Sequence, residues 1–410
     1  MEVLHPRCCG LDVHKDSVVA CALLAPAGGR ARKEGRTFGT TTAQIEALAG
    51  WLGERGVTHV AMESTGVYWV PLWNLLEARF ALRLVNAAHV KQGPGRKTDV
   101  ADAEWLADRL RHGLLRASFV PPQAQRELRE LTRYRAELVA ARTAEVNRLQ
   151  QTLEGANRKL GSVLSDVMGV SGRAILAALL AGERDAARLA ALAVGKLRAK
   201  PPDPEQALAG RVGDHHRLLL RHRLTHIDGL DAQLAELDAA IAERLADQAD
   251  VLERLDEIPG VGRRTAEGLV AEVGTDMARF PSAAHCASWA GLCPGHDQSA
   301  GKRRSGKTRQ GNRALRAALT EAAKAAGRTK HAALGQRYRR LRQRLGTKKA
   351  TVALARHILE VAYHLIRDGS RYQEPVPPPR GPLARQLEER RHVQALRQLG
   401  YHVTLQPTAA

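Results

Sequence analysis

The order of extended and helical segments in the first 112 residues constrains the fold more than any other feature of this sequence. Short apolar runs predict strands, and apolar residues at three- and four-residue spacing predict helices. The expected strands cover 7–13, 18–24, a segment around Thr37, 59–62 and 82–85, and the expected helices cover 43–54, 70–79 and 99–112. The resulting order, β-β-β-α-β-α-β-α, predicts an α/β domain that opens with a hairpin.

Two long polar segments follow, and each predicts a helix with one apolar stripe. The first stripe contains Leu128, Leu131, Leu138, Val146, Leu149 and Leu153, and the second contains Leu220, Leu224, Ile227, Leu234, Ile241 and Leu245. Alternating three- and four-residue steps are typical of a coiled coil, so we expect a coiled-coil arm. Asp231 and Asp238 fall on the second stripe, which predicts imperfect pairing and leaves the oligomeric state open.

Residues 251–367 predict a compact and mostly helical region with a basic centre, and the prolines of EPVPPPRGP end regular structure after it. We therefore expect four parts in this chain. These are an α/β domain at 1–118, a helical arm at 119–250, a helical C-terminal domain at 251–370, and a proline-rich linker and tail at 371–410.

Charge narrows the class of partner. Lys and Arg outnumber Asp and Glu by 63 to 43, which gives a net charge of +20 and favours a polyanion, first of all nucleic acid. No apolar run approaches the ~18 residues of a spanning helix, so a membrane role is not expected. The first residues lack the pattern of a secretory signal, and five unevenly placed cysteines do not suggest a disulfide framework. We expect a cytoplasmic protein with reduced cysteines.

Four carboxylates stand where a metal site could form. Asp12 and Glu63 come at the ends of two apolar strands, while Asp99 and Asp102 are three residues apart and share a helix face. Phosphodiester chemistry benefits from Mg²⁺, which prefers carboxylate oxygens. The alternative for each residue is an ordinary surface acid, and Asp16 and Glu104 are nearby acids that we interpret as structural.

Two glycine-rich segments predict contacts to phosphate. The turn Ile258-Pro259-Gly260-Val261-Gly262, followed by Arg263, resembles the hairpin of a helix-hairpin-helix element, in which backbone N–H groups approach a phosphate; an ordinary helix-helix turn is the alternative. The loop ahead of Asp99 contributes Lys97 as a further phosphate-binding candidate.

The segment GHDQSAGKRRSGKTRQGNRALR has no acid from Gly301 to Thr320. Its predicted phosphate-binding cations are Lys302, Arg303, Arg304, Lys307, Arg309 and Arg313. Ser299 stands at the start of this run, where cations could stabilise a serine alkoxide or the phosphate that it attacks. A capping or phosphate-binding hydroxyl is the alternative role, and Ser305 is the competing serine. A zinc site at His285, Cys286, Cys293 and His296 is not expected, because no C-x-x-C pair is present.

Several motifs in a fixed order identify a family resemblance. GLDVHKD, AMESTGVYW, KTDVADA, IPGVG and SWAGLCPGHDQSAGKRRSGKTRQGN together resemble the insertion-sequence 110 family of DEDD transposases, over residues 8 to 367. The resemblance implies a ribonuclease H-like N-terminal domain akin to RuvC-type resolvases, and a C-terminal transposase domain. It also implies that Asp12, Glu63, Asp99 and Asp102 form the Mg²⁺-binding tetrad and that Ser299 is the nucleophile.

The resemblance further implies a recombinase that cuts and rejoins donor and target double-stranded DNA under the guidance of a noncoding RNA, as a dimer or tetramer on DNA. Two alternatives remain open at this point. One is a RuvC-like junction-resolving nuclease that uses water instead of a serine. The other is a catalytically silent nucleic-acid-binding protein, which the four intact acids argue against.

Overall fold

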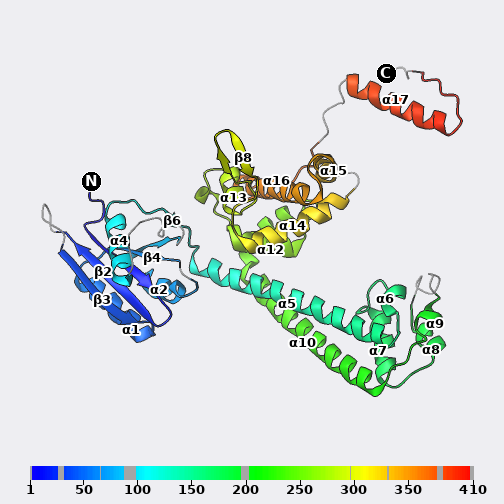
Figure 1. The fold of residues 1–410 in the computed structure, drawn as a ribbon, viewed down its shortest axis with the longest axis horizontal. Coiled ribbons are helices and arrows are strands. Elements are labelled where there is room, and N and C mark those ends of the chain that lie inside the picture. Colours follow the sequence, from blue (N-terminus) through cyan, green and yellow to red (C-terminus); the bar gives the residue numbers. More distant parts are fainter. Residues whose placement is uncertain are drawn as a thin grey trace. The chain divides into compact units, whose positions relative to one another are not determined.

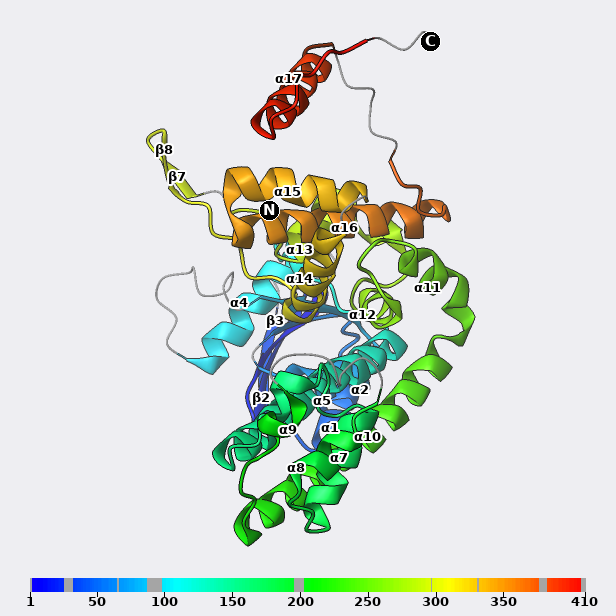
Figure 2. The same cartoon turned by 90° about the vertical axis from the view of Figure 1, so that its right-hand side faces the viewer.

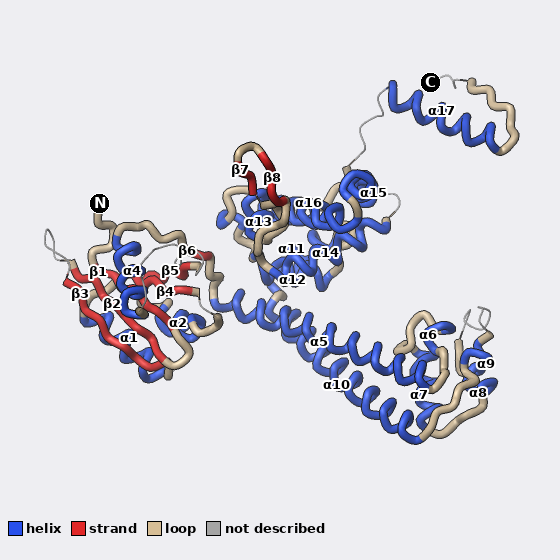
Figure 3. Tube along the Cα trace, in the orientation of Figure 1, coloured by secondary structure: helices blue, strands red, loops and turns tan. Residues whose placement is uncertain are grey.

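The computed structural model describes residues 2–25, 32–64, 66–86, 98–194, 203–295, 297–329, 332–375 and 382–406. The chain divides into two compact units, Met1–Ala124 and Gln125–Ala410 (Figure 1). Strands dominate the first unit and helices the second, as Figure 3 shows by colour. The finer division into four domains stays a prediction. None of the described helices is long and apolar enough to cross a membrane.

A six-stranded mixed sheet forms the centre of the first unit. Its strands are β1 (Arg7–Val13), β2 (Ser17–Leu24), β3 (Arg32–Gly39), β4 (His59–Glu63), β5 (Ala81–Val85) and β6 (Ala117–Ser118). They lie in the order β3-β2-β1-β4-β5-β6. The first three strands are antiparallel neighbours, β4 and β5 run parallel to β1, and β6 runs antiparallel to β5. The predicted hairpin and element order are confirmed, and β6 is an addition that the sequence pattern did not predict.

Helices cover both faces of this sheet. Side chains along each strand alternate between the faces, and apolar strand residues on both faces pack against helices. On one face, Leu11 of β1 and Met62 of β4 belong to the same buried cluster as residues of α1 (Thr42–Glu54) and α2 (Trp69–Leu76). On the other face, Cys8 and Ala61 belong to a second cluster together with α4 (Asp99–Arg111). The helix α4 therefore lies across β1 and β4 on the face opposite α1 and α2.

Gly10 allows α4 to approach the sheet closely. A Cβ atom at this position would lie 2.1 Å from the carbonyl oxygen of Ala103 and 2.6 Å from the amide nitrogen of Ala107, both in α4. Only glycine leaves room for a helix backbone at that distance. The beginning of α4 is thereby held beside the end of β1.

Two long helices, α5 (Gln123–Gly155) and α10 (Asp214–Arg244), lie side by side and antiparallel (Figures 1 and 2). Leu138 of α5 shares a buried cluster with Leu230 and Leu234 of α10. Each of the two acids on the apolar stripe of α10 forms an ion pair with an arginine of α5. Asp238 pairs with Arg135 and Asp231 pairs with Arg142.

Short helices connect α5 to α10 and form a small core of their own. They are α6 (Leu160–Val163), α7 (Val170–Leu180), α8 (Ala186–Ala191) and α9 (Pro204–Ala207). Their apolar residues pack with Leu149 and Leu153 at the end of α5 and with Leu220 and Ile227 of α10. This helical cap was not predicted, because its segments are too short to show a helical period.

The remainder of the second unit is a helical bundle around α16 (Thr347–Asp368). Its other elements are η2 (Ala246–Gln248), α11 (Ala249–Asp256), α12 (Arg263–Val273), η3 (Met277–Arg279), α13 (Ala283–Trp289), the hairpin β7 (Asp297–Ser299) and β8 (Lys302–Ser305), α14 (Arg313–Arg328) and α15 (Ala333–Leu345); α17 (Pro382–Gln398) follows them. Leu354, Ile358 and Leu359 of α16 are buried in the core, which Leu128 of α5 also joins. The expected helical C-terminal region is confirmed, and the hairpin is an unexpected insertion.

Candidate functional site

The first candidate site lies where β1 and β4 end. Leu11 pairs with Met62 across these parallel strands, so Asp12 and Glu63 are neighbouring residues at the same edge of the sheet. Asp12 follows Gly10 by two positions and Glu63 follows Ala61 by two, which places both acids on the face that α4 covers. The two strand-end acids of the sequence prediction thus share an edge and a face.

The beginning of α4 adds two further acids on that face. Thr98 caps the helix by accepting a hydrogen bond from the amide of Ala101, and Asp99 and Asp102 occupy the first turn. Acidic side chains are favoured there, because the helix dipole is positive at this end. The cap at Thr98 and the close approach of α4 to Gly10 together position the first turn of α4, which carries these two carboxylates.

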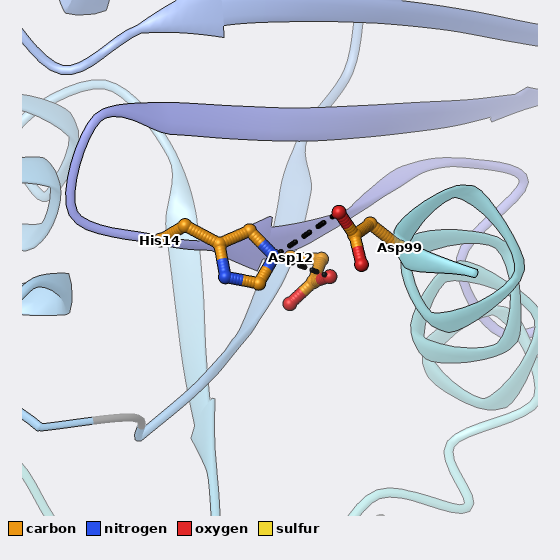
Figure 4. A group of neighbouring side chains, drawn as sticks. All are labelled: Asp12, His14 and Asp99. Carbon is orange, nitrogen blue, oxygen red and sulfur yellow. Dashed lines mark hydrogen bonds and ion pairs between the residues drawn. The ribbon is translucent and has the colours of Figure 1, made fainter. Parts of the chain in front are cut away.

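His14 joins two of the acids, as Figure 4 shows. Its Nε2 atom lies 3.1 Å from Oδ2 of Asp12 and 3.4 Å from Oδ2 of Asp99. Sequence reasoning did not select His14, although it stands two residues after Asp12 in the motif GLDVHKD. A histidine beside a strand-end acid was the available signal.

The electrostatics of Asp12 reflect this crowding. The residue is only 8% exposed, and burial raises the pKa of its carboxyl group above the ordinary 3.8. His14 acts in the opposite direction, while the nearby charges of Asp99 and Asp102 raise the pKa further. An additional cation at this edge would favour the charged carboxylate.

The donor set fits a divalent cation. Among the residues that the structure describes, Asp12, His14 and Asp99 form the group whose ligand atoms converge, all within 4.8 Å of one another. Carboxylate oxygens suit Mg²⁺, and a site that buries one of them has an excess of negative charge that such an ion would balance. Asp16 and Glu104, the alternative acids, are outside this group, and Glu104 forms an ion pair with Lys33 of β3.

The predicted serine lies in the second unit, at the tip of the β7–β8 hairpin. Ser299 is exposed and pairs with Lys302 across a two-residue turn of Ala300 and Gly301. Both turn residues have positive φ, 49° and 75°, which is the conformation of the tight hairpin turns that twisted strands favour. The competing serine, Ser305, lies at the far end of β8, where its hydroxyl accepts a hydrogen bond from the amide of Lys307.

The predicted cations do not all belong to one element. Lys302 is exposed on the hairpin, whereas Lys307 and Arg309 lie in the loop after it and Arg313 begins α14. The side chains of Arg303 and Arg304 and the whole of Lys97 lie outside the described residues.

The glycine turn joins α11 to α12, as expected for a turn between two helices. Gly260 has a φ of 88° and approaches α14, since a Cβ atom there would lie 2.4 Å from the carbonyl oxygen of Ala322. Gly262 is exposed and caps α12, and Arg263 pairs with Glu267 at 3.1 Å. Gly260 therefore allows α11 and α12 to pack closely against α14. The backbone of Gly262, by contrast, is exposed.

The cysteines are free and mostly buried, and burial raises the pKa of the Cys286 thiol to about 12. His285 exchanges hydrogen bonds with Ser282, the cap of α13. Within the described part of the chain neither residue belongs to a group of converging metal ligands, and His296 lies outside that part.

Two family models of known proteins match this chain. A transposase model of the IS110 DEDD type matches residues 9–157, and a model described as the transposase IS116/IS110/IS902 family matches residues 252–339. A probable family 20 transposase of Pseudomonas aeruginosa is 28% identical over 314 residues, which cover 75% of this chain and 83% of that protein.

Two further relatives are proteins of mobile or invertible DNA. An uncharacterized 44.8 kDa protein of insertion element IS116 from Streptomyces clavuligerus is 29% identical over 308 residues, 69% of this chain and 74% of that protein. A pilin gene-inverting protein of Moraxella bovis is 34% identical over 151 residues, 36% of this chain and 45% of that protein. Because the two family models together cover more than half of its residues, this chain belongs to the IS110 family of transposases.

Proposed function

We propose that this transposase cuts and rejoins donor and target DNA through a serine nucleophile, Ser299, and a Mg²⁺ site of four acids, Asp12, Glu63, Asp99 and Asp102. The observation that carries the proposal is the convergence of the Asp12 and Asp99 carboxylates on one nitrogen of His14, at the sheet edge where Glu63 also stands. Such an edge, formed by parallel strand ends and a helix start, holds several oxygen ligands in one place.

The strand order supports a ribonuclease H-like fold for the first unit. Three antiparallel strands continue into two parallel ones, and the acids gather at the end of the central strand β1. The antiparallel pair α5 and α10 supports a coiled-coil arm, with Arg135 and Arg142 neutralising the two acids on its seam.

In the proposed reaction, the Ser299 hydroxyl gives its proton to water and its oxygen forms a bond to a DNA phosphorus. The bond from phosphorus to the leaving deoxyribose oxygen breaks, and that oxygen takes up a proton. The reverse steps with a new strand end restore the serine and reseal the DNA. Exposure of Ser299 at a hairpin tip and the cation at Lys302 suit the approach of a phosphate.

Bound Mg²⁺ would supply charge stabilisation for the developing oxyanions, with Asp12 and Asp99 among its ligands because their carboxylates converge. The same acids repel a phosphate when no cation balances them. His14 contacts both carboxylates and links them to each other, which keeps the site assembled between reactions.

Donor and target choice would require a guide, because hairpin and loop cations bind phosphate without reading sequence. A bridge-type noncoding RNA is our proposal for that guide, and a homo-oligomer on DNA is our proposal for the assembly. The pilin gene-inverting relative acts on DNA by its name, and inversion is one form of the cutting and rejoining proposed here.

The decisive test is recombination of supercoiled donor and target DNA with Mg²⁺ and RNA from the flanks of the element. We expect the wild type to form a covalent protein–DNA adduct and Ser299→Ala to form none, with Ser305→Ala as the matched control. Cleavage that persists without Ser299 would favour a water-using, resolvase-type nuclease. DNA binding without cleavage in the wild type, unchanged by Asp12→Asn, would favour a silent binding protein.

A further inference from the structure

His14 lies between two acids of the first candidate site, but it is not one of the four acids and has no assigned role as a ligand. It is the first residue after β1, and its backbone amide donates a hydrogen bond to the carbonyl oxygen of Ser17 at 2.9 Å. That bond closes the turn between β1 and β2 at the end of the sheet where Asp12 lies. The hairpin therefore holds the backbone of His14 beside the acids.

The ring of His14 turns one nitrogen toward these acids. Nε2 faces Asp12 and Asp99, while the other nitrogen, Nδ1, lies on the side of the ring away from both carboxylates (Figure 4). A neutral imidazole binds a metal ion through one nitrogen and carries its proton on the other. With the proton on Nδ1, the nitrogen that faces the carboxylates is available as a ligand.

The spacing of the three ligand atoms fits a single ion. Nε2 lies 3.1 Å from Oδ2 of Asp12 and 3.4 Å from Oδ2 of Asp99, and the ligand atoms of the group all lie within 4.8 Å of one another. An octahedral ion with bonds of about 2.1 Å holds adjacent ligand atoms about 3.0 Å apart and opposite ones about 4.2 Å apart. Both distances from Nε2 are close to the adjacent spacing, so small shifts would let one ion contact all three atoms.

A purely structural role gives a weaker account of these contacts. The side chains of His14 and Asp99 are 45% and 61% exposed, and that of Asp12 is 12% exposed. Ion pairs between exposed groups contribute little to the stability of a fold, because water competes for both charges. The exposed side of the group also gives a hydrated ion access to the more buried carboxylate of Asp12.

A nitrogen ligand changes which ions such a site prefers. Mg²⁺ is a hard cation that takes oxygen ligands, whereas imidazole nitrogen is a common ligand of first-row transition-metal ions. A site made of carboxylates alone discriminates little between Mg²⁺ and Mn²⁺, since both ions suit oxygen ligands. The addition of His14 therefore raises the affinity for the transition-metal ion more than the affinity for Mg²⁺.

We propose that Nε2 of His14 is a ligand of the divalent cation that Asp12 and Asp99 hold, and that this nitrogen makes the site prefer Mn²⁺ and related first-row transition-metal ions to Mg²⁺. The inference rests on the proposed function, because it concerns the cation of the same acidic site. It adds a ligand that the pattern of four acids lacks. When the ion binds, bonds to it replace the contacts between Nε2 and the two carboxylates.

Pulsed electron paramagnetic resonance of bound Mn²⁺ tests this ligand directly, because the unpaired electrons of the ion couple to the nitrogen of a bound imidazole. With the full chain and substoichiometric Mn²⁺, we expect a nitrogen coupling in the wild type and none in His14→Ala. The affinity for Mn²⁺ should fall at least about tenfold in this variant, since even the outer-shell partners of metal ligands contribute about 10–100-fold. The affinity for Mg²⁺, measured by competition with Mn²⁺, should fall less.

The matched control is His112→Ala, which removes a histidine from the other end of α4. It should keep the nitrogen coupling and both affinities of the wild type. A second variant, His14→Gln, keeps a polar side chain between the acids and should lose the coupling as His14→Ala does.

Mn²⁺ that binds the wild type without a nitrogen coupling overturns the proposal. A coupling that survives in both His14 variants also overturns it, as does an equal loss of Mn²⁺ and Mg²⁺ affinity. If Asp12→Asn still abolishes Mn²⁺ binding in these cases, the acidic site of the proposed function stands without His14. Mn²⁺ binding that neither Asp12→Asn nor Asp99→Asn weakens would instead overturn the acidic site as well, so the two failures are distinguishable.

Discussion

The Nε2 atom of His14 lies 3.1 Å from Oδ2 of Asp12, at the end of the central strand of the first unit. The same nitrogen lies 3.4 Å from Asp99, so one ring links a residue of the sheet to a residue of α4. Two carboxylates that meet in this way repel each other, which raises the free energy of the folded state unless a cation lies between them. Several properties of the metal-free protein follow from that arrangement.

Divalent cations should stabilise the folded first unit. We expect the melting temperature to rise with Mg²⁺ or Mn²⁺, since a ligand at about 100 times its dissociation constant adds about 2.7 kcal/mol. Asp99→Asn should lose most of this rise because it removes one converging oxygen ligand. Glu104→Gln is the matched control on the same helix, and a rise that it abolishes equally would place the ion elsewhere.

The burial of Asp12 predicts a pH-dependent penalty. Burial raises its pKa in the folded protein above the ordinary 3.8, so the folded state binds this proton more tightly than the unfolded state does. Stability of the wild type should therefore decrease, relative to Asp12→Asn, as the pH rises above about 4. Urea unfolding of both proteins at pH 4 and pH 7 without metal measures this. A wild-type free energy of unfolding that stays constant or rises relative to that of Asp12→Asn between these pH values would contradict it.

A methyl group at Gly10 should separate α4 from the sheet. Gly10→Ala places a Cβ atom 2.1 Å from a backbone oxygen of α4, and overpacking of this kind destabilises by about 3 kcal/mol. The displaced helix carries Asp99, so stabilisation by Mg²⁺ should weaken in the same variant. Gly50→Ala is the matched control, because a Cβ atom there has open space and a helix interior favours alanine.

Loss of the Glu272 carboxylate should loosen the second unit. Glu272→Ala leaves Arg129 and Arg133 without their shared partner, and Arg129 is already so buried that its pKa falls to about 10. Removing one member of a buried pair costs about 3 kcal/mol, whereas Glu321→Ala, at an exposed ion pair, should cost less than about 1 kcal/mol. Equal costs in urea unfolding would show that the Glu272 network is not a structural link.

Local sequence patterns were sufficient to predict the elements that carry the acids. The apolar runs ending at Asp12 and near Glu63 and the helical spacing after Asp99 are local patterns, and local patterns specify strands and helices wherever one face is buried. The apolar stripes of α5 and α10 predicted these two helices for the same reason. The β7–β8 hairpin was not, because its second strand, KRRS, has no apolar alternation.

Which of these residues come into contact depends on how the elements of each unit pack together. Asp12 lies on the same face of β1 as Gly10, and it faces α4 because that helix packs against Gly10. Gly260 contacts the backbone of α14, about sixty residues later in the chain, and this contact gives it a role in helix packing. The seam acids Asp231 and Asp238 became ion pairs because the antiparallel register brought Arg142 and Arg135 to them. Sequence fixes local periodicity through backbone and side-chain sterics, whereas partners across elements are chosen by the packing of the whole unit, which no local window contains.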